Sequence, residues 1–234
     1  MAEKEGLPKE AISGVGAGSS LFSSPVFSSI YRYRIPFIVG VILLTVFVAG
    51  ILVLRHLAAK KEGEATTRFA EAYKVYSEAV TNDKSLEEAL ALYESVVSDY
   101  QGTTGATMSL FYAGNCQYSM ERYDDAITSY NSFLEQVANE YHLELLAYDS
   151  LGYCYEAKKD FTNAVESFKK TVSPAPGLGE SGYLNIARCY ELLGDTENSA
   201  AFYKKIVLEY PNGRSIDFVK EKIRVLESNG REER

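Results

Sequence analysis

The sequence has no tryptophan, only two histidines and only three cysteines among its 234 residues. The histidines are isolated and successive cysteines are at least 35 residues apart, so neither shows the spacing of metal ligands. Acidic pairs such as Glu87-Glu88 and Asp124-Asp125 fall at predicted helix starts, where negative charge complements the helix dipole. We therefore expect no catalytic, cofactor-binding or metal-binding residues, and we predict that the chain is not an enzyme.

Residues 35–54 contain no charged side chain, and Thr45 interrupts an otherwise almost wholly apolar run, IPFIVGVILLTVFVAGILVL. At about 1.5 Å per residue, such a helix spans roughly 30 Å, the thickness of the hydrocarbon core of a bilayer. A cleaved signal peptide would be shorter and would lie nearer the N-terminus. We predict an uncleaved transmembrane helix at 35–55, with membrane lipid as the partner of residues 35–54.

The segments beside this helix carry few structural signals. Residues 1–34, rich in glycine, serine and alanine, are expected to be a disordered tail, and residues 56–64 a juxtamembrane linker. Residues 1–56 hold five basic and three acidic side chains, so the total charge of −8 leaves −10 on residues 57–234. Because an acidic domain repels phosphate backbones, no nucleic acid partner is expected.

A helical pattern runs from about Ala65 to Ser228, and no long segment within it alternates with the period of a strand. Several helix starts carry capping residues. Ser85-Leu-Glu-Glu88 has the form of a capping box, while Asp160 and Ser215 precede further helices. We therefore predict an all-α fold.

The helical pattern repeats about every 35 residues. In each copy, a small residue on a first helix precedes a small residue and then an aromatic residue on a second helix. The copies have Gly114, Ala126 and Tyr130, then Gly152, Ala164 and Phe168, then Ala187, Ser199 and Tyr203, with a weaker copy at Ala89 and Tyr93. Small residues let two helices approach closely. No single hairpin buries its apolar face alone, so the copies are expected to stack into a solenoid.

This pattern resembles the tetratricopeptide repeat, a helical hairpin of about 34 residues. The predicted architecture is an N-terminal single transmembrane helix followed by a tetratricopeptide-like α-solenoid over residues 65–213. A capping helix at 214–228 closes the stack, and a tail follows at 229–234. The repeats are expected at about 65–104, 107–142, 145–178 and 180–213.

Cys116, Cys154 and Cys189 each follow the small residue of a first helix by two positions, so they occupy equivalent places in three repeats. Adjacent helices lie roughly 8–10 Å apart, whereas a disulfide needs Cα atoms within about 7 Å of each other. We expect three reduced, largely buried thiols that serve as small core residues.

The concave face of a tetratricopeptide stack is built mainly from first helices, and a mixed aromatic and polar groove suits an extended or partly unfolded polypeptide. The register places nine candidate peptide-groove residues on this face: Phe111, Asn115, Tyr118, Asp149, Tyr153, Glu156, Leu184, Arg188 and Glu191. The cations with which co-chaperones of this family grip acidic chain ends are missing, so a carboxylate clamp is not expected.

Basic residues flank the predicted membrane helix almost evenly, so flanking charge leaves its orientation open. They are Arg32 and Arg34 before the helix and Arg55, Lys60 and Lys61 after it. A short tail, one signal anchor and degenerate tetratricopeptide hairpins resemble the bacterial YfgM family, ancillary proteins of the SecYEG translocon, above all over Ala65 to Val137. This resemblance implies a tail in the cytoplasm, an anchor in the inner membrane and repeats in the periplasm.

The resulting hypothesis is a membrane-anchored protein-protein interaction scaffold, ancillary to protein translocation and chaperone handover at the bacterial inner membrane. Its expected partners are translocon subunits, chaperones or exported polypeptides. Two alternatives stay open. One is an envelope-assembly or cell-division scaffold that binds a fixed folded partner, and the other is an assembly factor whose repeats face the cytoplasm.

Overall fold

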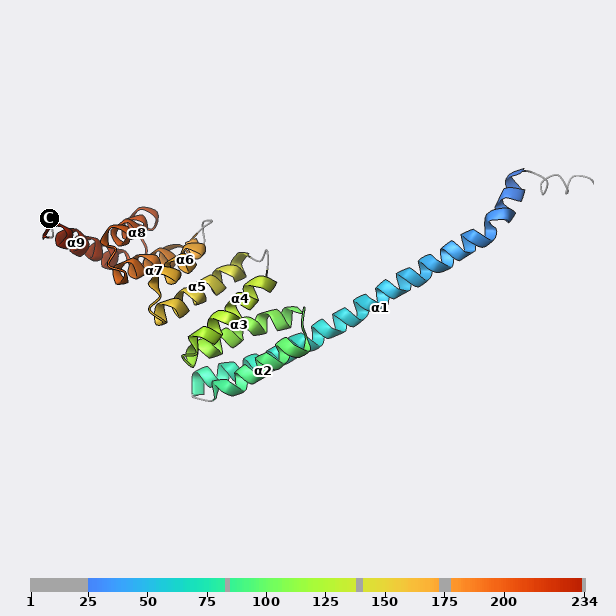
Figure 1. The fold of residues 1–234 in the computed structure, drawn as a ribbon, viewed down its shortest axis with the longest axis horizontal. Helices are drawn as coiled ribbons and strands as arrows, with labels where there is room; N and C mark the ends of the chain where they lie inside the picture. The colour runs from blue at the N-terminus through green and yellow to red at the C-terminus, as the bar shows by residue number, and fades with distance from the viewer. Residues whose placement is uncertain (1–24, 83–84, 138–140, 173–177, 233–234) are drawn as a thin grey trace, which may run out of the picture. The chain divides into compact units, whose positions relative to one another are not determined.

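The computed structural model describes residues 25–82, 85–137, 141–172 and 178–232, and every regular element in these ranges is a helix, as predicted. Figure 1 shows α1 (Pro25–Asn82), α2 (Leu86–Asp99), α3 (Thr104–Ser119), α4 (Tyr123–Gln136), α5 (Tyr141–Ala157), α6 (Phe161–Val172), α7 (Gly179–Leu192), α8 (Thr196–Glu209) and α9 (Ile216–Glu232). The chain divides into two compact units, Met1–Ala58 and Ala59–Arg234, which are described separately.

In the first unit, α1 presents an apolar surface that nothing in the described chain covers. The side chains from Ile35 to Leu54 are all exposed. Between Arg34 and Thr81, α1 contains an 18-residue window with a mean hydropathy of 3.1, of which 0% is buried. By length and composition alone, this helix can cross a membrane.

The bounds of α1 differ from the predicted division of this region. The helix begins at Pro25, inside the predicted tail 1–34, and continues through the predicted linker 56–64. Proline is tolerated in the first turn of a helix, and the linker is rich in alanine, lysine and glutamate, which favour helix. Residues 1–24 of the predicted tail lie outside the described residues. The other predicted domain bounds stay predictions.

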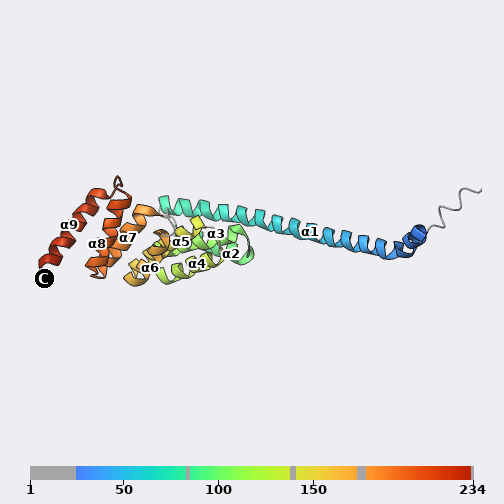
Figure 2. The same cartoon turned by 90° about the horizontal axis from the view of Figure 1, so that it is seen from above.

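In the second unit, the helices form a series of hairpins in which each helix packs against the next (Figures 1 and 2). The part of α1 after Ala58 pairs with α2, and the later hairpins are α3–α4, α5–α6 and α7–α8. This is the predicted solenoid of stacked hairpins.

Within each hairpin, an aromatic ring of the second helix lies against the small residue of the first helix. A Cβ atom added at Gly114 would lie 2.6 Å from the Tyr130 ring, and one added at Gly152 would lie 2.4 Å from the Phe168 ring. The predicted close approach of the paired helices is therefore confirmed. We call this contact the ring nest.

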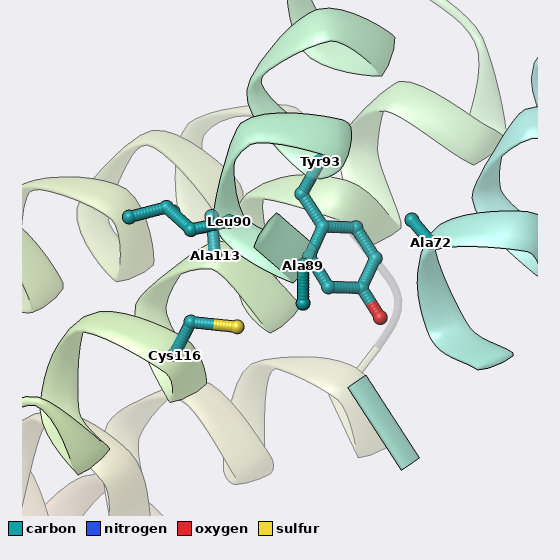
Figure 3. Packing of buried hydrophobic residues seen from close by; sticks show 6 residues of the cluster. All are labelled: Ala72, Ala89, Leu90, Tyr93, Ala113 and Cys116. Carbon is teal, nitrogen blue, oxygen red and sulfur yellow. The ribbon is translucent and has the colours of Figure 1, made fainter. Parts of the chain in front are cut away.

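The first hairpin has the same nest, with a partner that the sequence pattern did not identify. Tyr93 of α2 packs with Ala72 of α1 in one buried cluster, and both residues are 0% exposed. Figure 3 shows the Tyr93 ring extending from α2 toward Ala72. Ala72 was missed because it precedes Ala89 by 17 residues, whereas Gly114 precedes its counterpart by 12.

The helix caps agree only in part with the sequence analysis. Asp160 accepts a hydrogen bond from the backbone N–H of Asn163 at 3.2 Å, as expected of an N-cap. The predicted capping box at Ser85 is wrong, because its hydroxyl makes no cap hydrogen bond and instead donates to the carboxylate of Glu87 at 2.7 Å.

Helix α9 is the last helix of the described residues and runs to Glu232 rather than to the predicted bound at residue 228, and its capping role stays a prediction. Its buried residue Val219 packs against α7 and α8. Lys220 and Glu221 are exposed, whereas the equivalent residues of α7, 34 positions earlier, are the fully buried Ile186 and Ala187. A further second helix would therefore meet charge instead of an apolar surface.

The three cysteines are free and buried, which confirms their predicted role as core thiols. Burial raises the pKa of the Cys116, Cys154 and Cys189 thiols to about 12. Since the thiolate is the reactive species, these side chains are unreactive at neutral pH.

The ring nest predicts opposite effects for the same substitution at two helical glycines. Gly152→Ala places a methyl group against the buried Phe168 ring and should lower the free energy of unfolding by about 1–3 kcal/mol. Gly63→Ala meets nothing within 4 Å in α1 and should raise it by about 0.5–1 kcal/mol through helix propensity. Urea unfolding of the detergent-solubilised chain, followed by circular dichroism, measures both. A Gly152→Ala protein as stable as wild type would contradict the nest.

Candidate functional site

The first helices carry one face built from three register positions, spaced i, i+4 and i+7, which we call the first-helix face. On a helix, residues at this spacing lie on one side. The five copies are Phe69, Tyr73 and Tyr76 on α1, Phe111, Asn115 and Tyr118 on α3, Asp149, Tyr153 and Glu156 on α5, Leu184, Arg188 and Glu191 on α7, and Phe218, Lys222 and Val225 on α9. All nine predicted groove residues belong to it and are half-buried, and their role as a groove stays a prediction.

Contacts between neighbouring first helices support this register. On α7, the amide of Asn185 donates to the Tyr153 hydroxyl at 3.0 Å and to the Asp149 carboxylate at 3.4 Å. The equivalent residue of α3 is Tyr112, and its ring centroid lies 5.5 Å from Phe69 and 5.3 Å from Tyr73. Phe69 and Tyr73 are the α1 equivalents of Asp149 and Tyr153, so the same contact recurs two repeats apart.

The face extends onto two end helices, α1 and α9, that the predicted register did not include. On α1, the offset to the next repeat is 42 residues because α1 continues for ten residues after Ala72, whereas α3 ends five residues after Gly114. On α9, no second helix follows, so the small-then-aromatic signal is absent. The i, i+4, i+7 pattern of Phe69, Tyr73 and Tyr76 was the signal that could have found the first of them.

At α1 the face is aromatic, and Tyr112 of α3, which lies next to the face positions of its own helix, packs against it. The ring of Tyr112 has Tyr73, Tyr76 and Tyr93 around it, with centroids 5.3, 5.6 and 5.7 Å away. Tyr73 is the most accessible of these rings, with 44% of its surface exposed. We call the set Phe69, Tyr73, Tyr76 and Tyr112 the aromatic end.

From α5 to α9 the same face is ionic. Glu156 accepts two hydrogen bonds from the Arg188 guanidinium, at 2.9 and 2.6 Å, and Glu191 accepts one from Lys222 at 2.7 Å. In each pair, a third-position carboxylate meets the second-position cation of the next first helix. At the corresponding place, α3 and α5 carry Tyr118 and Tyr153 instead. Three of the predicted groove residues are therefore held in ion pairs between neighbouring helices in this structure: Glu156 with Arg188, and Glu191 with Lys222 of α9.

The hydroxyl groups of the ring nests are satisfied by this face in two hairpins but not in the first. Tyr130 donates to the Asn115 side-chain oxygen, and Tyr203 to the Glu191 carboxylate, both at 2.7 Å. The hydroxyl of Tyr93 is buried and makes no hydrogen bond within the described part of the chain. Since α1 has tyrosine at both positions that supply these acceptors, no carboxylate or amide is there to receive it.

One carboxyl group of the face is electrostatically unusual. Burial raises the pKa of Asp149 from 3.8 to about 6, although the Asn185 amide and the Arg188 charge act in the opposite direction. A partly desolvated carboxylate next to Tyr153 adds a hydrogen-bond acceptor to the middle of the face. The described residues contain no cluster of three or more His, Cys, Asp or Glu side chains that could hold a metal ion. The expected absence of catalysis stays a prediction.

Comparison with known proteins agrees with this geometry. Family models of the tetratricopeptide repeat match residues 108–139 and 182–213, and a second model of the same repeat matches residues 145–173. No curated protein matches the whole sequence closely enough to count as a relative. The chain therefore contains tetratricopeptide repeats, and each matched segment covers one of the later hairpins.

Solved structures share this fold at low sequence identity. A crystal structure of MamA protein aligns with a TM-score of 0.56 and 18% identity, over 72% of this chain and 84% of that chain. PilW, a type IV pilus biogenesis factor, aligns with a TM-score of 0.55 and 14% identity over 66% of each chain. The kinesin light chain repeats of Podosopora anserina give 0.53 and 16%, over 70% and 86%.

The hydroxyl of Tyr130 has a hydrogen-bond partner and that of Tyr93 has none, so replacing each tyrosine with phenylalanine should change stability in opposite directions. Tyr130→Phe leaves the Asn115 oxygen without its donor and should lower the free energy of unfolding by about 0.5–1.5 kcal/mol. Tyr93→Phe removes a buried hydroxyl without a partner and should raise it by about 1 kcal/mol. Urea denaturation of both variants measures the difference. If Tyr93→Phe is the less stable of the two, the Tyr93 hydroxyl has a partner after all.

The raised pKa of Asp149 predicts that Asp149→Asn increases the free energy of unfolding by an amount that depends on pH. The folded carboxyl has a pKa of about 6, above its ordinary 3.8, so it binds more protons than the unfolded one between these values. Stability is therefore lost as pH rises through this window. The variant keeps a side-chain oxygen that accepts from Asn185. Its free energy of unfolding should be about 1–2 kcal/mol higher than that of wild type at pH 7.5, and this difference should shrink toward pH 4.5. Denaturation curves at both pH values test this, and an equal gain at both would contradict it.

Proposed function

We propose that this chain is a membrane-anchored scaffold that binds a polypeptide partner on the first-helix face of its tetratricopeptide repeats. Tetratricopeptide repeats mediate protein–protein interactions, and this chain contains them. The observation that carries the proposal is the face itself, a set of aromatic, polar and aliphatic side chains at three equivalent positions on α1, α3, α5, α7 and α9. Rigid aromatic rings give contact area at a low cost in conformational entropy, which suits the binding of a chain segment.

The membrane anchor is the second part of the proposal. The side chains of residues 35–54 are exposed along a helix with a window mean hydropathy of 3.1, and water solvates such a surface unfavourably. A lipid bilayer covers it, and a helix satisfies its own backbone hydrogen bonds there. Support comes from length and composition, since twenty helical residues match the hydrocarbon core.

The finer proposal is a role ancillary to protein translocation and chaperone handover at the bacterial inner membrane, with the repeats in the periplasm. The resemblance to the YfgM architecture supports it. The three free cysteines are compatible with the oxidising periplasm, because all three are buried and burial raises the pKa of their thiols to about 12. Translocon subunits, chaperones and exported chains are the partners that this role implies.

A second candidate function is an envelope-assembly or cell-division scaffold with one folded partner. The ion pairs between α5, α7 and α9 favour it, because a surface whose side chains already hold one another is preorganised for a partner of fixed shape. The flanking charge leaves a third arrangement, with the repeats facing the cytoplasm, compatible with the same fold.

Photo-crosslinking from the face tests the proposal. A benzoylphenylalanine residue at Tyr118 or Tyr153 should give adducts with a translocon subunit, a chaperone or an exported chain, identified by mass spectrometry, because both side chains are half-buried on the face. The same probe at Ala201, an exposed residue of the second helix α8, is the matched control and should give none of these adducts.

Three results separate the candidates. Adducts with one stoichiometric folded protein, and none with exported chains, would favour the assembly scaffold. A reporter enzyme fused after Arg234 and active only in the cytoplasm would reverse the orientation. Identical adducts from Ala201 and from Tyr118 would remove the first-helix face from the proposal.

A further inference from the structure

We propose that the aromatic end, Phe69, Tyr73, Tyr76 and Tyr112, is the subsite where the partner's chain docks, as an extended segment that is not acidic. The inference rests on the proposed function and narrows it to one end of the stack. The partner's backbone places a carbonyl group on the buried hydroxyl of Tyr93, and its side chains lie against the surrounding rings.

From α5 to α9, the charged side chains of the face already bind one another. Glu156 is held by Arg188 through two hydrogen bonds, and Glu191 by both Lys222 and Tyr203. A segment bound there would have to replace these charge-assisted bonds, which are stronger than neutral ones. At the aromatic end, the side chains meet through ring contacts, which an inserted apolar side chain can extend rather than break.

The Tyr93 hydroxyl supplies the polar anchor of the subsite. It is buried without a hydrogen bond in the described structure, and its neighbouring groups are Cys116, Tyr112, Tyr76 and Tyr73. Its counterparts in two other hairpins each donate to an acceptor on a first helix. A segment in extended conformation carries one backbone carbonyl per residue and can supply the missing acceptor. Tyr73, 44% exposed, is the ring of the aromatic end that such a segment can contact most readily from solvent.

Charge defines the occupant further. Residues 57–234 carry a net charge of −10, which attracts a basic segment and repels an acidic one. The faces of tyrosine rings also attract lysine and arginine side chains. The occupant we propose is therefore a segment of another protein in which apolar side chains, which pack on the rings, alternate with basic side chains, which the acidic domain attracts.

A defined peptide tests this on the full chain in lipid nanodiscs. The probe is a fluorescein-labelled nonapeptide in which phenylalanine and leucine alternate with lysine, followed by fluorescence anisotropy. Wild type should bind it. Tyr93→Phe should weaken binding about 3- to 10-fold by removing one hydrogen bond. Tyr73→Ser should weaken it at least about as much by removing the exposed ring.

Matched controls separate binding from folding. Tyr130→Phe changes a tyrosine of the same type in the next hairpin and should bind with wild-type affinity although its melting temperature falls. Tyr93→Phe should bind more weakly although its melting temperature rises, which a purely structural effect would not produce. A peptide with glutamate in place of lysine should bind at least about 10-fold more weakly at low salt, a difference that added salt reduces.

Two outcomes overturn the inference. One is equal affinity of wild type, Tyr93→Phe and Tyr73→Ser for the lysine peptide, and the other is no binding of that peptide to wild type. Neither decides the proposed function, since crosslinks from Tyr118 and Tyr153 report on any partner of the face. Failure of both experiments removes the scaffold proposal together with its subsite.

Discussion

The ring nest is the contact on which the rest of the structure depends. A glycine or alanine on the first helix and a buried ring on the second fix how closely the two helices lie, because interiors are packed too densely to absorb even one extra methyl group. Once this distance is fixed in each hairpin, the same side of every first helix faces the same way. The i, i+4, i+7 positions then line up from helix to helix, and the first-helix face follows from the packing.

Most of the hairpins could be predicted because each nest uses the same residue types at the same spacing in the sequence. Gly114, Gly152 and Ala187 revealed three hairpins, and their cysteine neighbours were correctly expected to be buried and free. The predicted bounds were wrong where the composition of a short segment was interpreted without the helix that precedes it. The polar stretch at 56–64 was interpreted as a linker, yet its alanine, lysine and glutamate residues favour helix, and nothing in it ends α1.

The roles of individual face residues could not be predicted from one sequence. Glu156, Arg188 and Glu191 were correctly placed on first helices, but an ion pair joins residues 32 positions apart, and no sequence rule gives that distance without the stacking geometry. The missing partner of Tyr93 was equally hidden. It becomes visible only when the three tyrosine nests are compared and one of them is found without an acceptor.

Comparison of the four nests shows that packing does not explain the hydroxyl group of Tyr93. Phe168 fills its nest over Gly152 without a hydroxyl group, so a bare ring is sufficient to hold a hairpin together. The hydroxyls of Tyr130 and Tyr203 add hydrogen bonds to first helices, which accounts for them. The hydroxyl of Tyr93 adds none, and its burial costs about 1 kcal/mol. A phenylalanine there would be the more stable choice, and natural sequences depart from local optima most often at functional sites. Among the three tyrosine nests, the first is where this chain gives up stability that the other two retain.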